Sequence, residues 1–179
     1  LGVRKPMMRT FRAGKLVTED AAPQIHNGAD DNASGVSGIL EIARELRHHP
    51  LNRSVLFIAF SAEESGLHGS KFYVSAPTAA LDKTVAMLNL DMIGRLPLNS
   101  RSVQVFGTKT GSSFEEMLAG AARKAGLTIA ATPDAGGRSD HASFARAKMP
   151  VLHFFSGQHS DYHKPSDDSD KINAKDGVR

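Results

Sequence analysis

The pattern of hydrophobic and polar positions alternates between short apolar runs and amphipathic stretches. Two continuous apolar runs, at residues 54–61 and 84–91, are typical of strands buried on both faces of a sheet. Shorter runs predict further strands at 103–107, 127–132 and 150–155. We therefore expect a central sheet that contains parallel strands.

Helices are predicted between these strands. Apolar residues recur at spacings of three and four from 33 to 48, which predicts an amphipathic helix that ends before Pro50. A second such helix is predicted over 112–125, and shorter ones over 67–74 and 140–147. This alternation predicts an α/β fold, a three-layer α/β/α sandwich around a central mixed, mostly parallel sheet. Before the first helix, residues 1–27 predict a loop with one short strand at 15–18.

Composition narrows the function classes. The 179 residues are 40% hydrophobic and 23% charged, which is typical of a soluble globular protein and excludes a disordered chain. The longest apolar run, Val55–Phe60, is far shorter than the ~20 residues that span a bilayer. Cysteine is absent, which excludes disulfides, thiolate ligands and cysteine nucleophiles. Lys and Arg are scattered at a net charge of +3 and Trp is absent, so we expect no nucleic-acid partner.

Acidic and histidine side chains follow three of the predicted strands, and one acid pair, Asp30-Asp31, comes just before the first predicted helix. In α/β sheets, ligands bind outside the carboxyl ends of the strands, so these side chains are expected to converge. Acids that converge raise one another's pKa unless a cation neutralises them, and Asp, Glu and His are ligands that zinc accepts. The sequence therefore predicts a divalent metal site. Its candidate residues are Asp30, Asp31, Glu63, Glu64, Asp91, His159, Asp161, Tyr162 and His163.

Five sequence blocks make the chemistry more specific. Motifs of other catalysts, namely HExxH, GxSxG, GxxxxGK[ST] and GxGxxG, are absent. The blocks are GADDNASG (28–35), SAEESGLHGS (61–70), NLDMIG (89–94), SDHASF (139–144) and YHKPSDD (162–168). In this order they resemble the co-catalytic zinc aminopeptidases of the bacterial leucyl-aminopeptidase and aminopeptidase Y type (clan MH), relatives of glutamate carboxypeptidase and glutaminyl cyclase. The resemblance covers about residues 25–177.

The resemblance implies a set of zinc ligands. Asp31 matches a carboxylate that bridges two zinc ions, and its place at a helix N-terminus favours negative charge. Glu64 and His163 match the other ligands of the first zinc, and Asp91 matches a ligand of the second.

It also implies catalytic and supporting roles. Glu63 matches the general base, which takes a proton from metal-activated water, and Tyr162 matches a donor to the developing oxyanion. Asp167 is expected to orient the His163 imidazole from the second shell, and Asp140 to act in the second shell or cap a helix.

One family feature has no match here. The family has a further histidine ligand, in an HxD motif at a strand end upstream of the GADD block. Because the chain begins at Leu1, we expect residues 1–179 to form a single zinc peptidase catalytic domain that lacks this strand and the final helix. The first zinc should then bind more tightly than the second. His26 is the alternative source of the missing ligand.

We therefore expect a zinc-dependent exopeptidase, an aminopeptidase acting on peptide substrates, with this chain by itself weakly active or inactive. Two alternatives stay open: a single-zinc acyltransferase like glutaminyl cyclase, and a non-catalytic metal-binding fragment. The resemblance also implies export to the periplasm or outside the cell, and further domains in the full-length protein are compatible with it.

Overall fold

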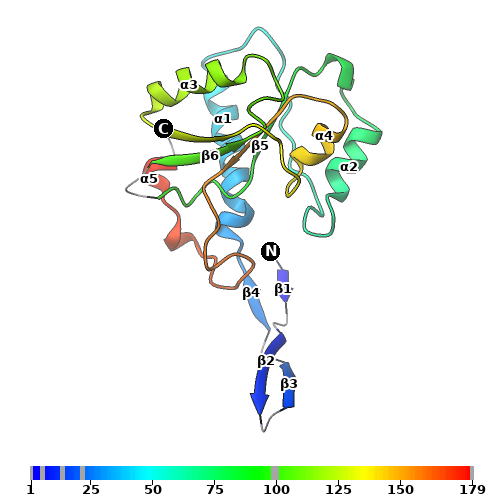
Figure 1. Ribbon diagram of the computed structural model, residues 1–179, viewed down its shortest axis with the longest axis vertical. Helices are drawn as coiled ribbons and strands as arrows, with labels where there is room; N and C mark the ends of the chain where they lie inside the picture. The colour runs from blue at the N-terminus through cyan, green and yellow to red at the C-terminus, as the bar shows by residue number, and fades with distance from the viewer. Residues whose placement is uncertain (1, 5–6, 13–14, 21–22, 98–100, 178–179) are drawn as a thin grey trace.

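The computed structural model describes residues 2–4, 7–12, 15–20, 23–97 and 101–177. Its central sheet has four strands in the order β5 (Met87–Leu90), β8 (Val151–Phe155), β6 (Ser102–Phe106) and β7 (Thr128–Thr132) (Figure 1). β5 is parallel to β8 and β6 is parallel to β7, whereas β6 and β8 are antiparallel. The predicted mixed, mostly parallel sheet is confirmed.

Helices cover both faces of this sheet. Four helices lie near the predicted ranges: α1 (Gly35–Leu46), α2 (His68–Ser75), α3 (Phe114–Ala125) and α4 (His141–Arg146). Short helical turns lie at η1 (Ala29–Ser34), η2 (Leu81–Lys83), η3 (Ser169–Lys171) and α5 (Ala174–Gly177). No helix of the described residues is long and apolar enough to cross a membrane.

Two core clusters show how the layers pack. On β8, neighbouring side chains point to opposite faces, as the strand period of two requires. Leu152 packs with Val105 and with the buried face of α3. Val151 packs with Phe144 of α4 and Met149, together with partly buried side chains of α2. The β8 strand is thus buried on both faces, in agreement with its continuous apolar sequence.

The apolar run at 54–61 was predicted as a buried strand, and this prediction is wrong. The segment has no strand pairing, and the backbone of 54–60 makes no hydrogen bond with other described residues. Val55, Leu56 and Phe57 are 46%, 55% and 38% exposed. An apolar run favours extended backbone, but a strand also needs a neighbouring strand to pair with.

A groove lies where that pairing would be. Its walls are Ile58–Phe60 on one side and Met87–Asp91 on the other, and its volume is about 330 Å³. β5 pairs with β8 along one edge only, so its opposite edge faces this groove.

The N-terminal part contains more strands than predicted. β1 (Gly2–Arg4) pairs with β4 (Gln24–His26), and β2 (Met7–Arg12) pairs with β3 (Lys15–Asp20), both antiparallel. The strand predicted at 15–18 lies within β3. β1, β2 and β4 were not predicted, because strands that pair locally in an antiparallel ladder do not need a long apolar run.

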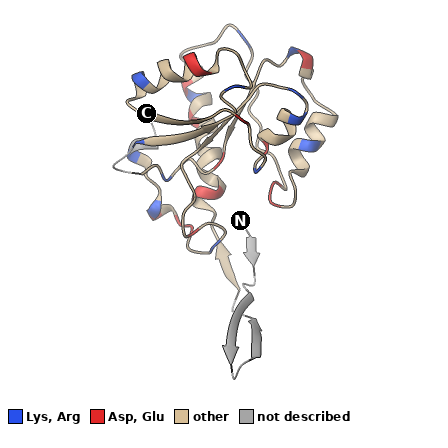
Figure 2. Ribbon diagram, in the orientation of Figure 1, with Lys and Arg blue, Asp and Glu red and all other residues tan. Residues whose placement is uncertain are grey.

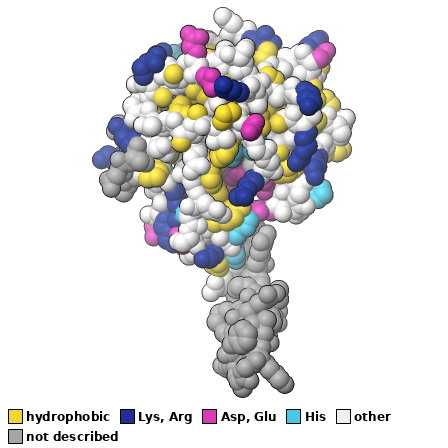
Figure 3. All heavy atoms as spheres, in the orientation of Figure 1, with side chains coloured by type: hydrophobic (Ala, Val, Ile, Leu, Met, Phe, Trp, Pro, Cys, Tyr) yellow, Lys and Arg dark blue, Asp and Glu magenta, His cyan; other side chains and the backbone are white. Residues whose placement is uncertain are grey.

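Charged side chains are dispersed over the described surface. Lys and Arg alternate with acidic and neutral residues along the ribbon (Figure 2). On the face seen in Figure 3 the basic side chains form no continuous patch.

We predict that Phe144→Ala lowers the free energy of unfolding by about 3–5 kcal/mol, because it empties a buried aromatic site. The Phe144 ring lies 5.9 Å from that of Phe60 and 5.8 Å from that of Tyr73, and the residue is 3% exposed. The matched control is Phe72→Ala, at a position 72% exposed on α2, which should change the value by less than about 0.5 kcal/mol. Urea denaturation measures both, and equal effects would contradict the packing described here.

Candidate metal and catalytic site

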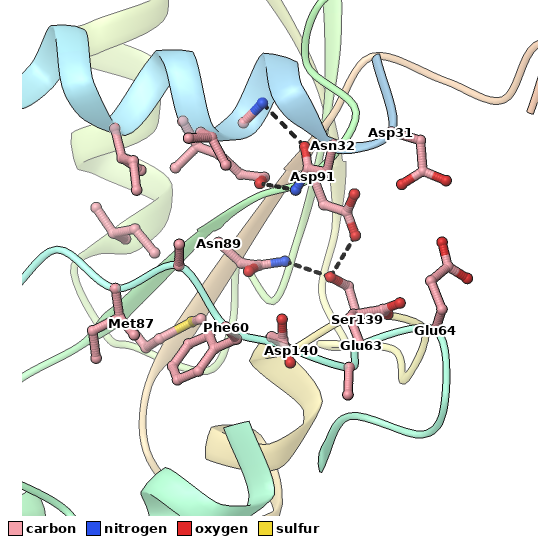
Figure 4. Close-up of a pocket in the computed structure, with 18 residues that line it drawn as sticks. Asp31, Asn32, Phe60, Glu63, Glu64, Met87, Asn89, Asp91, Ser139 and Asp140 are labelled. Carbon is pink, nitrogen blue, oxygen red and sulfur yellow. Dashed lines mark hydrogen bonds between the residues drawn. The ribbon is translucent and has the colours of Figure 1, made fainter. Parts of the chain in front are cut away.

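Three loops bring Asp31, Glu64 and His163 together. The His163 Nε2 atom lies 3.1 Å from Asp31 Oδ2 and 2.8 Å from Glu64 Oε1. One donor atom from each residue falls within 4.8 Å of the others. In Figure 4 the Asp31 and Glu64 carboxylates lie near each other at one end of the groove. These are the three side chains that the sequence resemblance assigns to the first zinc.

This donor set fits a zinc ion. Ligand atoms at about 2.0–2.1 Å from a tetrahedral zinc lie about 3.3 Å from one another, close to the two separations seen here. Two carboxylates and one imidazole are ligand types that zinc accepts, and three protein ligands leave a fourth position for water or substrate. The residues present can therefore hold one zinc ion with little movement.

Asp31 is positioned through its backbone. It lies in the irregular turn η1, where the N–H groups of Asp30 and Asp31 both donate to Asp167 Oδ2 at 3.0 Å. The Ala29 N–H donates to the backbone carbonyl of Asp167 at the same distance. The loop after β8 thus holds the turn that carries Asp31.

Asn32 fixes the same turn to the end of β5. Its Nδ2 atom donates to the Leu90 carbonyl at 3.0 Å, and its Oδ1 atom accepts from the N–H groups of Gly35 and Met92. Gly35 is required here, since a Cβ would stand 2.3 Å from the Leu90 carbonyl oxygen. Hydrogen bonds of the Asn32 side-chain amide therefore hold the turn that carries Asp31 against the sheet.

Glu63 and Glu64 lie in the turn between residues 54–60 and α2. The Glu63 carbonyl accepts from the N–H groups of Gly66 and Leu67 at 2.9 and 2.8 Å. A Cβ on Gly69 would stand 2.6 Å from the Ser61 carbonyl oxygen, so only glycine lets α2 close on the start of this turn. The turn directs Glu63 toward the groove and Glu64 toward His163.

Asp91 follows β5 and is held by a hydrogen-bonded chain. Ser139 Oγ donates to Asp91 Oδ2 at 2.6 Å, and Asn89 Nδ2 donates to Ser139 Oγ at 2.8 Å. Asn89 Nδ2 also lies 3.1 Å from Nδ1 of the buried His153. Asp91 lines the groove but is outside the three-donor group found among the described residues.

Sequence reasoning missed these supporting residues. Ser139 lies beside Asp140 in the SDHASF block, which was a usable signal. Asn89 and His153 read as parts of apolar strands, and only the structure shows that they meet. His141 is also buried, and its ring stacks on that of His153 with centroids 4.3 Å apart.

Asp140 and Asp167, the two residues expected in supporting roles, differ in the hydrogen bonds that their carboxylates accept. Asp140 is the N-cap residue of α4, but no backbone N–H of that helix donates to its carboxylate, and its buried Oδ1 atom has no hydrogen-bond partner among the described residues. Asp167 makes its side-chain hydrogen bonds to the backbone of Asp30 and Asp31 and to Arg95. None of the described hydrogen bonds joins Asp167 to the His163 ring.

Tyr162 and His163 lie together in the loop after β8. Their rings stack with centroids 3.7 Å apart. Burial and the negative charges of Glu64 and Asp31 raise the pKa of Tyr162 to about 12, so its phenol stays protonated at neutral pH and can donate. His26, the alternative ligand, lies in β4 and is not in the three-donor group of the described residues.

Four carboxyl groups in and around the groove have pKa values above their usual range. Burial first, and then the charges of Glu64 and Asp91, raises the pKa of Asp31 to about 7. Burial and the charges of Asp91 and Glu64 raise the pKa of Glu63 to about 7 as well. Burial also raises the pKa of Asp91 and of Asp140. This is the electrostatic condition of a site that a divalent cation would stabilise.

Comparisons with known proteins agree with this chemistry. The chain is 34% identical over 182 residues to aminopeptidase YwaD of Bacillus subtilis (strain 168), covering 96% of this chain and 40% of that protein. It is 35% identical over 153 residues to leupeptin-inactivating enzyme 1 of Streptomyces exfoliatus, covering 84% and 33%. This chain thus spans two fifths or less of the length of these relatives.

Solved structures of similar proteins also match this chain. The crystal structure of BSAP, a zinc aminopeptidase from Bacillus subtilis, matches with a TM-score of 0.74 at 33% identity, over 85% of this chain and 39% of that one. LapB from Legionella pneumophila matches with a TM-score of 0.74 at 26% identity, over 86% and 44%. The sequence model of peptidase family M28 matches residues 15–177. The chain therefore belongs to peptidase family M28.

Proposed function

We propose that the protein is a zinc-dependent aminopeptidase that removes N-terminal residues from peptides. The observation that carries this proposal is the convergence of Asp31, Glu64 and His163 within 4.8 Å, with Glu63 adjacent in the same groove. Relatives described as aminopeptidases, one of them a zinc enzyme, support hydrolysis over the two alternatives, the cyclase-like acyltransferase and the non-catalytic fragment.

The family resemblance implies the proposed roles, and the arrangement of these side chains supports them. Zinc held by Asp31, Glu64 and His163 would supply Lewis acidity and activate water. Glu63, with a pKa of about 7 in the metal-free chain, is poised to take a proton from that water and return it to the leaving amine. Tyr162, protonated at neutral pH, would donate to the oxyanion.

A second zinc position is proposed around Asp31 and Asp91. Asp91 lies at the end of the groove between residues 58–60 and β5. Because neither residues 58–60 nor the outer edge of β5 pairs with a strand here, the groove suits one further strand, and a histidine at its carboxyl end would complete this position. This supports the proposal that the catalytic domain includes an HxD strand beyond residues 1–179.

Export of the enzyme and additional domains in the full-length protein stay proposals implied by the family resemblance.

Replacing the general base should separate catalysis from metal binding. We expect Glu63→Gln to lower turnover of a chromogenic aminoacyl amide by about 10²–10⁴-fold, because proton transfer is lost, while zinc content stays unchanged. Glu115→Gln, exposed on α3, is the matched control and should retain activity. Full turnover by Glu63→Gln would contradict the assignment, and formation of a cyclised product from an N-terminal glutaminyl peptide would favour the cyclase alternative.

Zinc stoichiometry tests the ligand assignment. After dialysis against trace zinc, we expect about one zinc per chain, because the described residues group three donors at one position. His163→Ala should abolish this binding, whereas Asp91→Asn should leave it intact. A version extended by the upstream strand should bind a second ion. Equal occupancy with and without that strand would contradict the proposal for the groove.

The raised pKa of Asp31 predicts a pH-dependent effect on stability in the metal-free chain. Its carboxyl pKa is about 7 when folded against about 3.9 when unfolded, so the folded state binds more protons between these values and loses stability as pH rises through them. With a chelator present, Asp31→Asn should therefore raise Tm at pH 8 and have little effect at pH 5. An equal effect of the substitution at pH 5 and pH 8 would contradict a raised pKa of Asp31.

Zinc should reverse the sign of that substitution. With zinc present at pH 8, Asp31→Asn should lower Tm, because the wild-type carboxylate then binds the ion. A substitution that stabilises equally with and without zinc would show that Asp31 is not a ligand.

A further inference from the structure

Two carboxylates of the loop after β8, which carries the proposed zinc ligand His163, meet on one largely buried arginine. Arg95 follows β5, and its side chain is 13% exposed. Its Nη1 atom donates to Asp161 Oδ2 and its Nη2 atom donates to Asp167 Oδ1, both at 2.7 Å. Its backbone N–H donates to Ser156 Oγ at 3.3 Å, at the start of the same loop.

The Asp167 branch leads to Asp31. While Oδ1 of Asp167 accepts from Arg95, Oδ2 accepts the N–H groups of Asp30 and Asp31 at 3.0 Å each. The Asp167 side chain is 2% exposed, so water cannot replace these partners. The guanidinium is therefore one hydrogen bond away from the carboxylate that holds the backbone of Asp31.

The Asp161 branch leads to His163. Asp161 lies two residues before His163, and its Oδ1 atom accepts from Ser166 Oγ at 2.6 Å and from Lys171 Nζ at 2.8 Å. Together with Arg95, these donors hold the pKa of Asp161 well below its usual range. They fold residues 161–171 into one hydrogen-bonded unit, from which the His163 ring extends to Asp31 and Glu64.

Arginine suits this position because its planar fork presents two donors in fixed directions. Among the ion pairs of the described residues, Lys171 pairs with the Asp161 carboxylate alone, whereas Arg95 pairs with the carboxylates of both Asp161 and Asp167. A lysine at position 95 would offer one ammonium point charge and could not reproduce both contacts in the same geometry.

We infer that Arg95 is a positioning residue that sets the separation of Asp31 and His163 before zinc binds. This inference rests on the proposed function in that it takes these two residues as zinc ligands. Groups that orient metal ligands typically change metal affinity by about 10–100-fold when removed. Ordering the loop after β8 costs conformational entropy. If Arg95 did not order this loop in the metal-free chain, zinc binding would have to compensate that cost and the affinity for zinc would be lower.

The test measures zinc affinity of the metal-free chain by competition with a chromogenic chelator. Arg95→Met should weaken zinc binding by about 10–100-fold, with Arg95→Lys between it and the wild type. Arg44→Met is the matched control, since Arg44 pairs with Glu41 and Glu45 on the exposed face of α1, and should leave the affinity unchanged.

Hydrogen exchange supplies a readout that does not depend on zinc. In the metal-free Arg95→Met chain, the amides of residues 159–168 should exchange faster, while those of β8 keep wild-type rates. If this variant does not fold, Asp161→Asn removes the loop branch while leaving the pair of Arg95 with Asp167. It should then show weaker zinc binding and the same faster loop exchange.

The outcomes separate this inference from the proposed function. Folded variants that bind zinc within about twofold of the wild type, with unchanged exchange at 159–168, would overturn the role of Arg95. A wild-type chain that binds no zinc would overturn the proposed metal site, and the exchange rates at 159–168 would still decide whether Arg95 orders the loop.

Discussion

Negative charge gathered at the carboxyl end of β5 is the constraint on which the rest of the site depends. Asp31, Glu63 and Asp91 are partly buried and close enough that each one's charge acts on another. Burial makes ionised carboxylates costly unless a cation or hydrogen-bond donors compensate them. The fold answers this in two ways. Arg95 neutralises the carboxylates of the supporting loop, and the three-donor group leaves a place for a metal ion.

The supporting contacts show why the three donor residues keep defined positions although they lie outside strands and long helices. None of Asp31, Glu64 and His163 lies within a strand or a long helix. Asn32 fixes the first to β5, backbone hydrogen bonds fix the second to the start of α2, and the loop of the third is bound to Arg95 and Lys171. The rigid sheet thus positions the site through polar side chains.

Much of this was predictable from sequence, for identifiable reasons. Continuous apolar runs found β5 and β8, because both strands lie in a sheet covered by helices. Acids directly after apolar runs identified Glu64 and Asp91 as candidates, and an acid pair just before the first helix identified Asp31. Arg95 was not predictable, because a single basic residue after a strand has no local signature, and its two carboxylate partners lie 66 and 72 positions away. The hydrogen bonds of Asp167 to Arg95 and to the backbone of residues 30 and 31 have no local sequence signature for the same reason.

Residues 54–60, which were predicted as a strand but pair with none, give Glu64 and Asp91 different surroundings. Phe60 packs against Tyr73 and Phe144, so the segment is held by side chains from α2 and α4, although its backbone is unpaired. Glu64 is therefore well placed toward His163, on the side where packing is complete. Asp91, in contrast, faces the groove at the open edge of β5, where Ser139 is its hydrogen-bond donor. Among the described residues, three donors therefore gather on the packed side of the groove, whereas Asp91 stands outside that group at its open edge.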